Sequence, residues 1–156
     1  MKNKYIYIPL VFLVVFIMAI KGEGRNTIDL TEYQWRNRLL LLFIPSLDGA
    51  GYATLKKDLS AHQEEVLDRD LLVFHILRSG ETKLGNALLS ENSGDYLREK
   101  FSVKCGTFTV LLIGKDGSVK LRREEIVKLD EIFSLIDTMP MRQREMREKS
   151  RQRRNQ

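Results

Sequence analysis

Two uninterrupted apolar runs, residues 39–44 and residues 71–77, predict strands that are buried on both faces. The first run is stopped by Pro45. Between the two runs, apolar residues recur at near-helical spacing among lysines and glutamates, which predicts an amphipathic helix over residues 52–66. A strand, a helix and a second strand in this order indicate a right-handed parallel crossover unit.

The second half of the chain predicts an antiparallel hairpin followed by a helix. Residues 107–113 and 118–121 have strand patterns, and the Asp-Gly pair within the connecting residues 114–117 is a strong hairpin signal because its turn needs positive φ. Apolar positions at helical spacing then predict a helix over residues 124–138, which Pro140 ends.

The stretch between the second strand and the hairpin has the weakest pattern. Residues 79–93 are broken by glycines and are expected to form a loop with one helical turn around Leu84 and Leu88. Residues 95–101 predict a short helix. The complete order predicts an α/β fold, a thioredoxin-like three-layer sandwich in which helices flank a mixed four-stranded sheet over residues 27–140.

The N-terminal segment indicates export. Two lysines within residues 1–4 precede an apolar run over residues 5–20, and a short stretch containing Gly22 and Gly24 follows. The run is slightly long for a signal core and slightly short for a bilayer span, so a cleaved signal peptide and an uncleaved anchor over residues 1–22 both stay open. The protein is therefore expected in the periplasm or outside the cell, or anchored to the membrane by this segment.

The charge of the chain is concentrated at its C-terminal end. The formal net charge is +5, and residues 141–156 hold seven Lys or Arg against two Glu, so the other 140 residues sum to zero. This basic charged tail has Arg144 and Glu148, and Glu145 and Lys149, at i,i+4 spacing, which favours a solvated helix. A plain soluble terminus and adhesion to an anionic surface remain alternatives. Nucleic acid is not an expected partner, because no aromatic side chains are interleaved for base stacking.

The turn after the first strand has no cysteine, although a thioredoxin-like enzyme would hold its reactive thiolate there at a helix N-terminus. Ser46 lies in this turn without the Gly-x-Ser-x-Gly frame of a nucleophile elbow. Backbone amides freed by Gly49 and Gly51 could hold an anion, with Arg38 or Lys115 as the counter-charge. The simpler alternative is a flexible glycine loop.

Few other side chains have the types or spacing that chemistry needs. Cys105 is the single cysteine, and it is expected to be a small buried hydrophobic residue, the alternative being a reactive thiol. His62 and His75 have no ligand-like neighbours, so no metal site is expected, and His75 is interpreted as a hydrogen-bonded packing residue. No cofactor is expected either.

The remaining charged residues are interpreted as local structure. Arg69 is expected to pair with its neighbours Asp68 and Asp70. Lys115, together with Asp116, is interpreted as part of the chemistry of the hairpin turn.

Two phrases resemble a known family. These are residues 112–117 with the strand that follows, and residues 136–142; the motif residues are Lys115, Asp116, Gly117, Asp137, Met139, Pro140, Met141 and Arg142. With residues 35–38 and 68–70, they resemble the bacterial domain of unknown function family 4174, which is similar to the repeated module of coiled-coil-domain-containing protein eighty. The resemblance implies a thioredoxin-like or peroxiredoxin-like fold and no assigned activity.

Taken together, these patterns favour an exported, redox-inactive module that binds an envelope or extracellular partner. The alternative is an enzyme, an atypical thiol oxidoreductase or peroxidase that uses Cys105.

Overall fold

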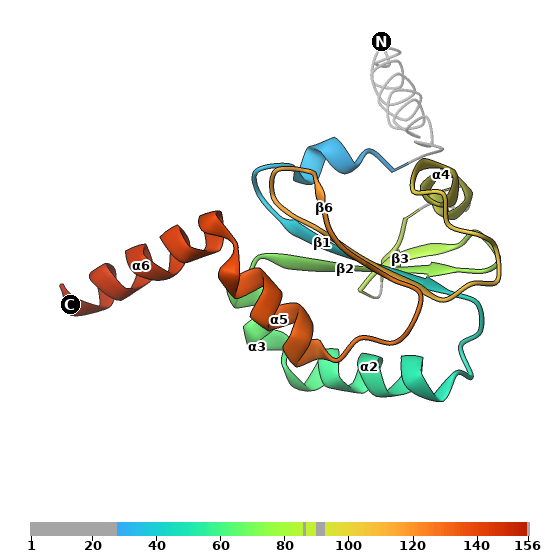
Figure 1. Cartoon of the computed structure of the whole chain (residues 1–156), viewed down its shortest axis with the longest axis horizontal. Coiled ribbons are helices and arrows are strands. Elements are labelled where there is room, and N and C mark those ends of the chain that lie inside the picture. Colours follow the sequence, from blue (N-terminus) through green and yellow to red (C-terminus); the bar gives the residue numbers. More distant parts are fainter. Residues whose placement is uncertain (1–27, 86, 90–92, 156) are drawn as a thin grey trace, which may run out of the picture.

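A mixed sheet of six strands lies between two layers of helices in the computed structural model, which describes residues 28–85, 87–89 and 93–155 (Figure 1). The strand order is β4-β3-β2-β1-β5-β6. The N-terminal segment predicted over residues 1–22 lies outside the described residues. Within the described ranges, no helix is both long enough and apolar enough to cross a bilayer.

The first predicted strand is the centre of the sheet. β1 (Arg38–Ile44) runs parallel to β2 (Leu71–Leu77) and antiparallel to β5 (Thr109–Ile113), and every residue of β1 is buried. β6 (Val119–Arg123) closes one side of the sheet by pairing with β5. The crossover unit and the hairpin predicted from the apolar runs are therefore confirmed.

Alternate residues of β1 divide the core into two clusters, because successive side chains of a strand point to opposite faces. Leu40, Leu42 and Ile44 pack with one set of helices, and the other face of β1 packs with a second set. The first set consists of α2 (Ala50–Ala61), α3 (Gln63–Asp68) and α5 (Leu129–Thr138). The second consists of the 3₁₀ helix η1 (Leu30–Tyr33) and α4 (Ser93–Lys100).

Two of the predicted elements are different in the structure. The single helix expected over residues 52–66 is broken at His62, whose φ of −115° and ψ of 38° are not helical, so α2 and α3 are separate. The helical turn expected around Leu84 and Leu88 is wrong: this stretch contains β3 (Thr82–Leu84) and β4 (Ala87–Leu88). β3 pairs with the free side of β2, which extends the sheet from the expected four strands to six.

The last helices also begin at positions that the sequence did not indicate. α5 starts at Leu129, five residues after the expected start, and its end at Thr138 agrees with the prediction. Pro140 does more than end that helix, because it is the first residue of α6 (Pro140–Arg154), where a missing backbone N–H costs nothing. α6 leaves the body of the domain at the left of Figure 1.

Candidate functional site

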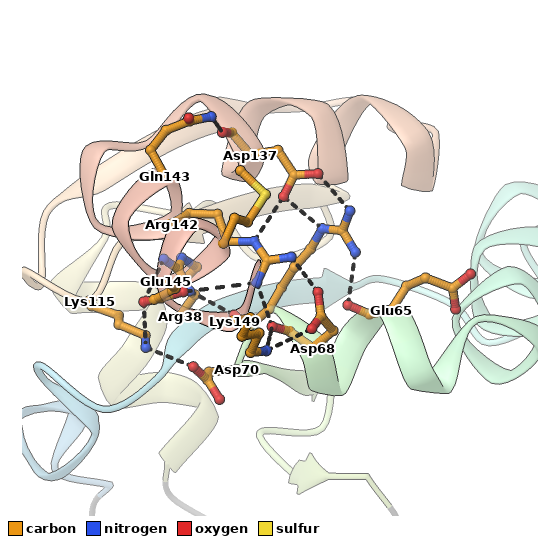
Figure 2. A network of polar contacts seen from close by, with 12 residues as sticks. Arg38, Glu65, Asp68, Asp70, Lys115, Asp137, Arg142, Gln143, Glu145 and Lys149 are labelled. Atoms are coloured by element: carbon orange, nitrogen blue, oxygen red, sulfur yellow. Dashed lines mark hydrogen bonds and ion pairs between the residues drawn. The ribbon is translucent and has the colours of Figure 1, made fainter. Parts of the chain in front are cut away.

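Charged side chains from several segments meet at the edge of the sheet where β1 and β2 begin (Figure 2). Arg38 is the first residue of β1, and Lys115 follows the end of β5, which lies beside the start of β1 because these strands are antiparallel. We call the group the edge network; its members are Arg38, Asp68, Arg69, Asp70, Lys115, Asp137, Arg142, Glu145 and Lys149.

Glu145 of α6 is the acceptor for two buried cations. The Arg38 guanidinium donates to its two carboxylate oxygens at 3.1 and 3.2 Å, and the Lys115 ammonium pairs with it at 2.8 Å. The side chains of Arg38 and Lys115 are only 1% and 9% exposed. Burial opposes the ionisation of Glu145, but the hydrogen bonds from Lys115 and Arg38 outweigh it, so the pKa of Glu145 lies below its usual value.

Arg142 joins α6 to the segment before β2. Its side chain is 4% exposed; Nε donates to Asp137 at 3.0 Å, one terminal nitrogen donates to the Asp68 carbonyl at 2.6 Å, and the other pairs with the Asp68 carboxylate. Lys149 also donates to that carboxylate, at 2.6 Å. The hydrogen bonds from Lys149 and Arg142 lower the pKa of Asp68 to about 2.

Arg69 does not pair with its two neighbours, so the expected local ion-pair device is wrong. Its guanidinium donates to Asp137 at 2.6 and 3.1 Å and lies over the Phe133 ring, 4.3 Å from the ring centroid. The Asp68 carboxylate pairs with Arg142 and Lys149 of α6, and the Asp70 carboxylate pairs with Lys115 at 2.7 Å. These three residues therefore pair with segments that are distant in the sequence, and not with one another.

Several residues of the two family-motif segments therefore have structural roles at or near this edge. Asp137 and Arg142 are members of the edge network, Met139 is buried, and Pro140 opens α6. The interpretation as hairpin-turn chemistry is confirmed for Asp116, which pairs with Lys120 at 2.8 Å beside Gly117 at φ +79°. It is wrong for Lys115, whose ammonium group pairs with Asp70 and Glu145 in the edge network.

The opposite side of α6 presents a row of arginines. Arg144, Arg147, Arg151 and Arg154 are spaced at i, i+3, i+7 and i+10, which places them on one face of the helix, and all four are exposed. We call them the arginine stripe. None of the four forms an ion pair with any described residue. The tail helix is confirmed, but both expected ion pairs within it are wrong. Arg144 and Glu148 form no ion pair with any described residue, and Glu145 and Lys149 pair with the domain instead.

The turn after β1 lies at the other end of that strand from Arg38 and Lys115. Seven residues of strand separate the two places by about 20 Å. The structure thus brings Arg38 and Lys115 together, but not with Ser46, Gly49 or Gly51. Packing explains the glycine at position 51, because a Cβ atom there would overlap the side chain of Ile126.

Cys105 is exposed, so the expectation of a buried cysteine is wrong. It lies in the connection between α4 and β5, where Val103 is the buried apolar side chain instead. Thr109, four residues later, pairs with Phe43 near the end of β1. The connection that carries Cys105 therefore lies at the same sheet edge as the turn after β1.

His75 is a hydrogen-bonded packing residue, as predicted. Its Nδ1 lies 3.1 Å from the Tyr52 hydroxyl, and the two rings meet edge to face with centroids 5.9 Å apart. Burial, and then the charges of Lys56 and Lys83, lower the pKa of His75 to about 4, so it is neutral at pH 7. In the part of the chain that the structure describes, no cluster of His, Cys, Asp and Glu could hold a metal ion.

Sequence reasoning missed Glu145 as the partner of Arg38 and Lys115. A signal was present: Arg142, Glu145 and Lys149 have the i, i+3 and i+7 spacing of one helix face, opposite the arginine stripe. This face of α6, on which a glutamate lies between basic residues, is the face that packs against the domain.

Solved structures share this architecture. The reduced 2-Cys peroxiredoxin of Plasmodium vivax is similar over 75% of this chain and 85% of its own, with a TM-score of 0.55 and 15% identity. The mitochondrial 2-Cys peroxiredoxin of Plasmodium falciparum is similar over 71% of this chain and 80% of its own, with a TM-score of 0.51 and 14% identity. At such identities the likeness shows a shared thioredoxin-like fold.

The family match extends through Glu145, the α6 residue that binds Arg38 and Lys115. Residues 29–145 match the family described as "Domain of unknown function (DUF4174)". The protein is therefore a member of the DUF4174 family.

Proposed function

We propose that the protein is an exported binding module without thiol chemistry, which the arginine stripe holds against an anionic surface. The observation that carries the proposal is the two-sided character of α6. One side is fixed to the domain through Arg142, Glu145 and Lys149, and the other side presents four arginines.

The docking of α6 supports binding because it fixes the helix before any ligand arrives. The stripe covers ten helical steps, about 15 Å, and the helix already holds its four backbone positions on one side, toward an extended negative surface. A basic residue near anionic lipid contributes on the order of 1 kcal/mol. Four such residues together contribute on the order of 4 kcal/mol, which corresponds to a weak and reversible attachment.

The absence of a thiol from the turn after β1 supports a role other than redox catalysis. A reactive cysteine of this fold class gains its low pKa at a helix N-terminus, and here Gly49 and Ala50 begin α2 without one. The single cysteine of the chain is Cys105, which has no second cysteine to resolve a disulfide within the chain.

The test compares the full chain with a variant in which all four stripe arginines are replaced by Gln. Vesicles that contain anionic lipid should sediment with the wild-type protein at low salt and much less with the variant, while zwitterionic vesicles should not distinguish the two proteins. An immobilised anionic polymer serves as a second arm. Equal retention of both proteins on both anionic surfaces would refute the proposal. Deletion of residues 141–156 is unsuitable, because it also removes Arg142 and Glu145.

A second function, an atypical thiol oxidoreductase or peroxidase, is favoured by one observation. Cys105 is exposed, and its connection lies at the sheet edge where the turn after β1 also lies. Cys105→Ser should leave the stability unchanged, because the side chain is exposed. If the wild-type protein turns over peroxide or a disulfide and Cys105→Ser does not, the enzyme is the correct assignment.

A further inference from the structure

A groove of about 510 Å³ lies between helices α2 and α3 and strands β2 and β3. This volume is within the range of small-molecule sites in proteins. No residue of the arginine stripe and no member of the edge network lines the groove, although its residues Leu67 and Leu71 are the chain neighbours of Asp68 and Asp70.

The walls of the groove are mainly apolar. Leu71 and Val73 of β2 contribute the sheet side, and Leu59 and Val66 contribute the helix side. Leu67 also lines the groove and is 72% exposed, the highest value among the large exposed hydrophobic side chains of the described residues. An apolar side chain left in water beside an apolar groove gains stability when an apolar ligand covers it.

The polar groups of the groove carry positive charge or hydrogen-bonding capacity, but no negative charge. Lys56 and Ser60 lie one turn apart on α2, and Gln63 is the first residue of α3. No Asp or Glu is among the described residues that line the groove. The lysine is therefore available to an anion.

His75 lies beside this positive charge. Lys56 and His75 both line the groove, and the charges of Lys56 and Lys83 oppose the protonation of the ring. Lys83 is the register partner of His75 across β2 and β3, and it already pairs with Glu81 at 2.9 Å. Tyr52 occupies Nδ1, and Nε2 has no hydrogen-bond partner among the described residues. A neutral imidazole with one free nitrogen can complete the binding of an anionic head group.

We propose that the groove binds a monoanionic apolar acid, with its carboxylate at Lys56 and His75 and its hydrocarbon chain along Leu59, Val73 and Leu67. One unpaired ammonium group matches one carboxylate, and a chain of several methylenes matches the apolar walls.

The probe is octanoate, with octan-1-ol as the uncharged equivalent and acetate as the head group without a chain. Amide shifts in two-dimensional NMR at pH 7.5 should move at groove residues with octanoate, move at higher concentrations with octan-1-ol, and not move with acetate. Lys56→Gln should weaken octanoate binding about tenfold, the effect of losing one charge-assisted hydrogen bond, and leave octan-1-ol binding unchanged.

Matched variants separate this site from general effects. Lys57→Gln removes the same charge from the adjacent exposed position, which does not line the groove, and should bind octanoate like the wild type. Leu67→Gln changes an exposed side chain that the fold does not need and should weaken both octanoate and octan-1-ol. The proposal is overturned if octanoate does not shift the groove amides, or if acetate shifts them equally. It is also overturned if Lys56→Gln and Lys57→Gln behave alike, or if protein concentration alone shifts the groove amides, since a second copy would then be the occupant.

Discussion

Arg38 and Glu145 are separated by 107 residues in the chain and form a two-point ion pair at 3.1 and 3.2 Å. The arginine is the first residue of the central strand and is 1% exposed, and the glutamate lies in α6. The boundary expected at residue 140 therefore falls inside an interaction network, and the first turns of the basic tail belong to the domain. This docking directs the arginine stripe outward.

Glu145→Gln should destabilise the protein by about 2–4 kcal/mol, because it leaves the Arg38 charge buried without a carboxylate partner and removes one of the two carboxylates that pair with Lys115. The free energy of unfolding in urea measures this change. Glu148→Gln is the matched control: the position is exposed and forms no ion pair with the described residues, so we expect a change within about 0.5 kcal/mol. Equal effects of the two substitutions would contradict the structural role of Glu145.

Asp68→Asn should destabilise the protein in a pH-dependent manner. The pKa of Asp68 is lowered to about 2 by hydrogen bonds from Lys149 and Arg142, so its contribution is fully present above about pH 5 and is lost as the pH falls toward about 2. The difference in unfolding free energy between wild type and variant should therefore be large at pH 7 and small near pH 2. Glu64→Gln, an exposed change on α3, should show little difference at either pH. A difference in unfolding free energy that does not change with pH would show that the ion pairs of Asp68 are not its source.

His75 should titrate with a midpoint near pH 4 in NMR spectra of the folded protein. Burial lowers its pKa first, and the charges of Lys56 and Lys83 lower it further, so Lys56→Gln should raise the midpoint. Because the unfolded chain takes up this proton near pH 6.5, the stability contributed by neutral His75 is present above that pH and is lost between about pH 6.5 and 4. A midpoint near 6.5 would show that the ring is not buried beside these lysines.

Gly94→Ala should destabilise the protein by about 1–3 kcal/mol despite the better helix propensity of alanine. A Cβ atom at this position in α4 would lie 2.8 Å from the carbonyl carbon of Gly80 and would overlap its oxygen, and no side-chain rotation can relieve a clash with backbone. Gly49→Ser is the control. Its nearest neighbour would be 3.6 Å away and serine is a favoured N-cap, so thermal unfolding should change little. Similar melting temperatures for Gly94→Ala and the wild type would disprove the close contact.

The central sheet could be predicted because its strands are buried on both faces and read as continuous apolar runs. β3 and β4 could not, because strands of three and two residues are too short to show a pattern, and their pairing depends on the free side of β2. The break at His62 had no proline or glycine to mark it.

The ion pairs of the edge network could not be predicted from the sequence for a different reason. Local spacing offered plausible partners for Arg69 and Lys149 within their own segments, whereas the actual partners are Asp137 and Asp68. Ion pairing between distant segments depends on the tertiary fold and not on sequence neighbours. The exposure of Cys105 was missed similarly, since a lone cysteine has no periodic signal of its own.

The most direct test of the account compares two variants of equal net charge on vesicles that contain anionic lipid. One replaces the stripe residues Arg144, Arg147, Arg151 and Arg154 with Gln, and the other replaces four exposed basic residues elsewhere, Arg36, Lys57, Arg78 and Lys104. At low salt, we expect the stripe variant to lose at least tenfold in vesicle affinity and the other variant to bind nearly as well as the wild type. Equal losses from the two variants would show that total charge, and not the outward face of α6, governs binding.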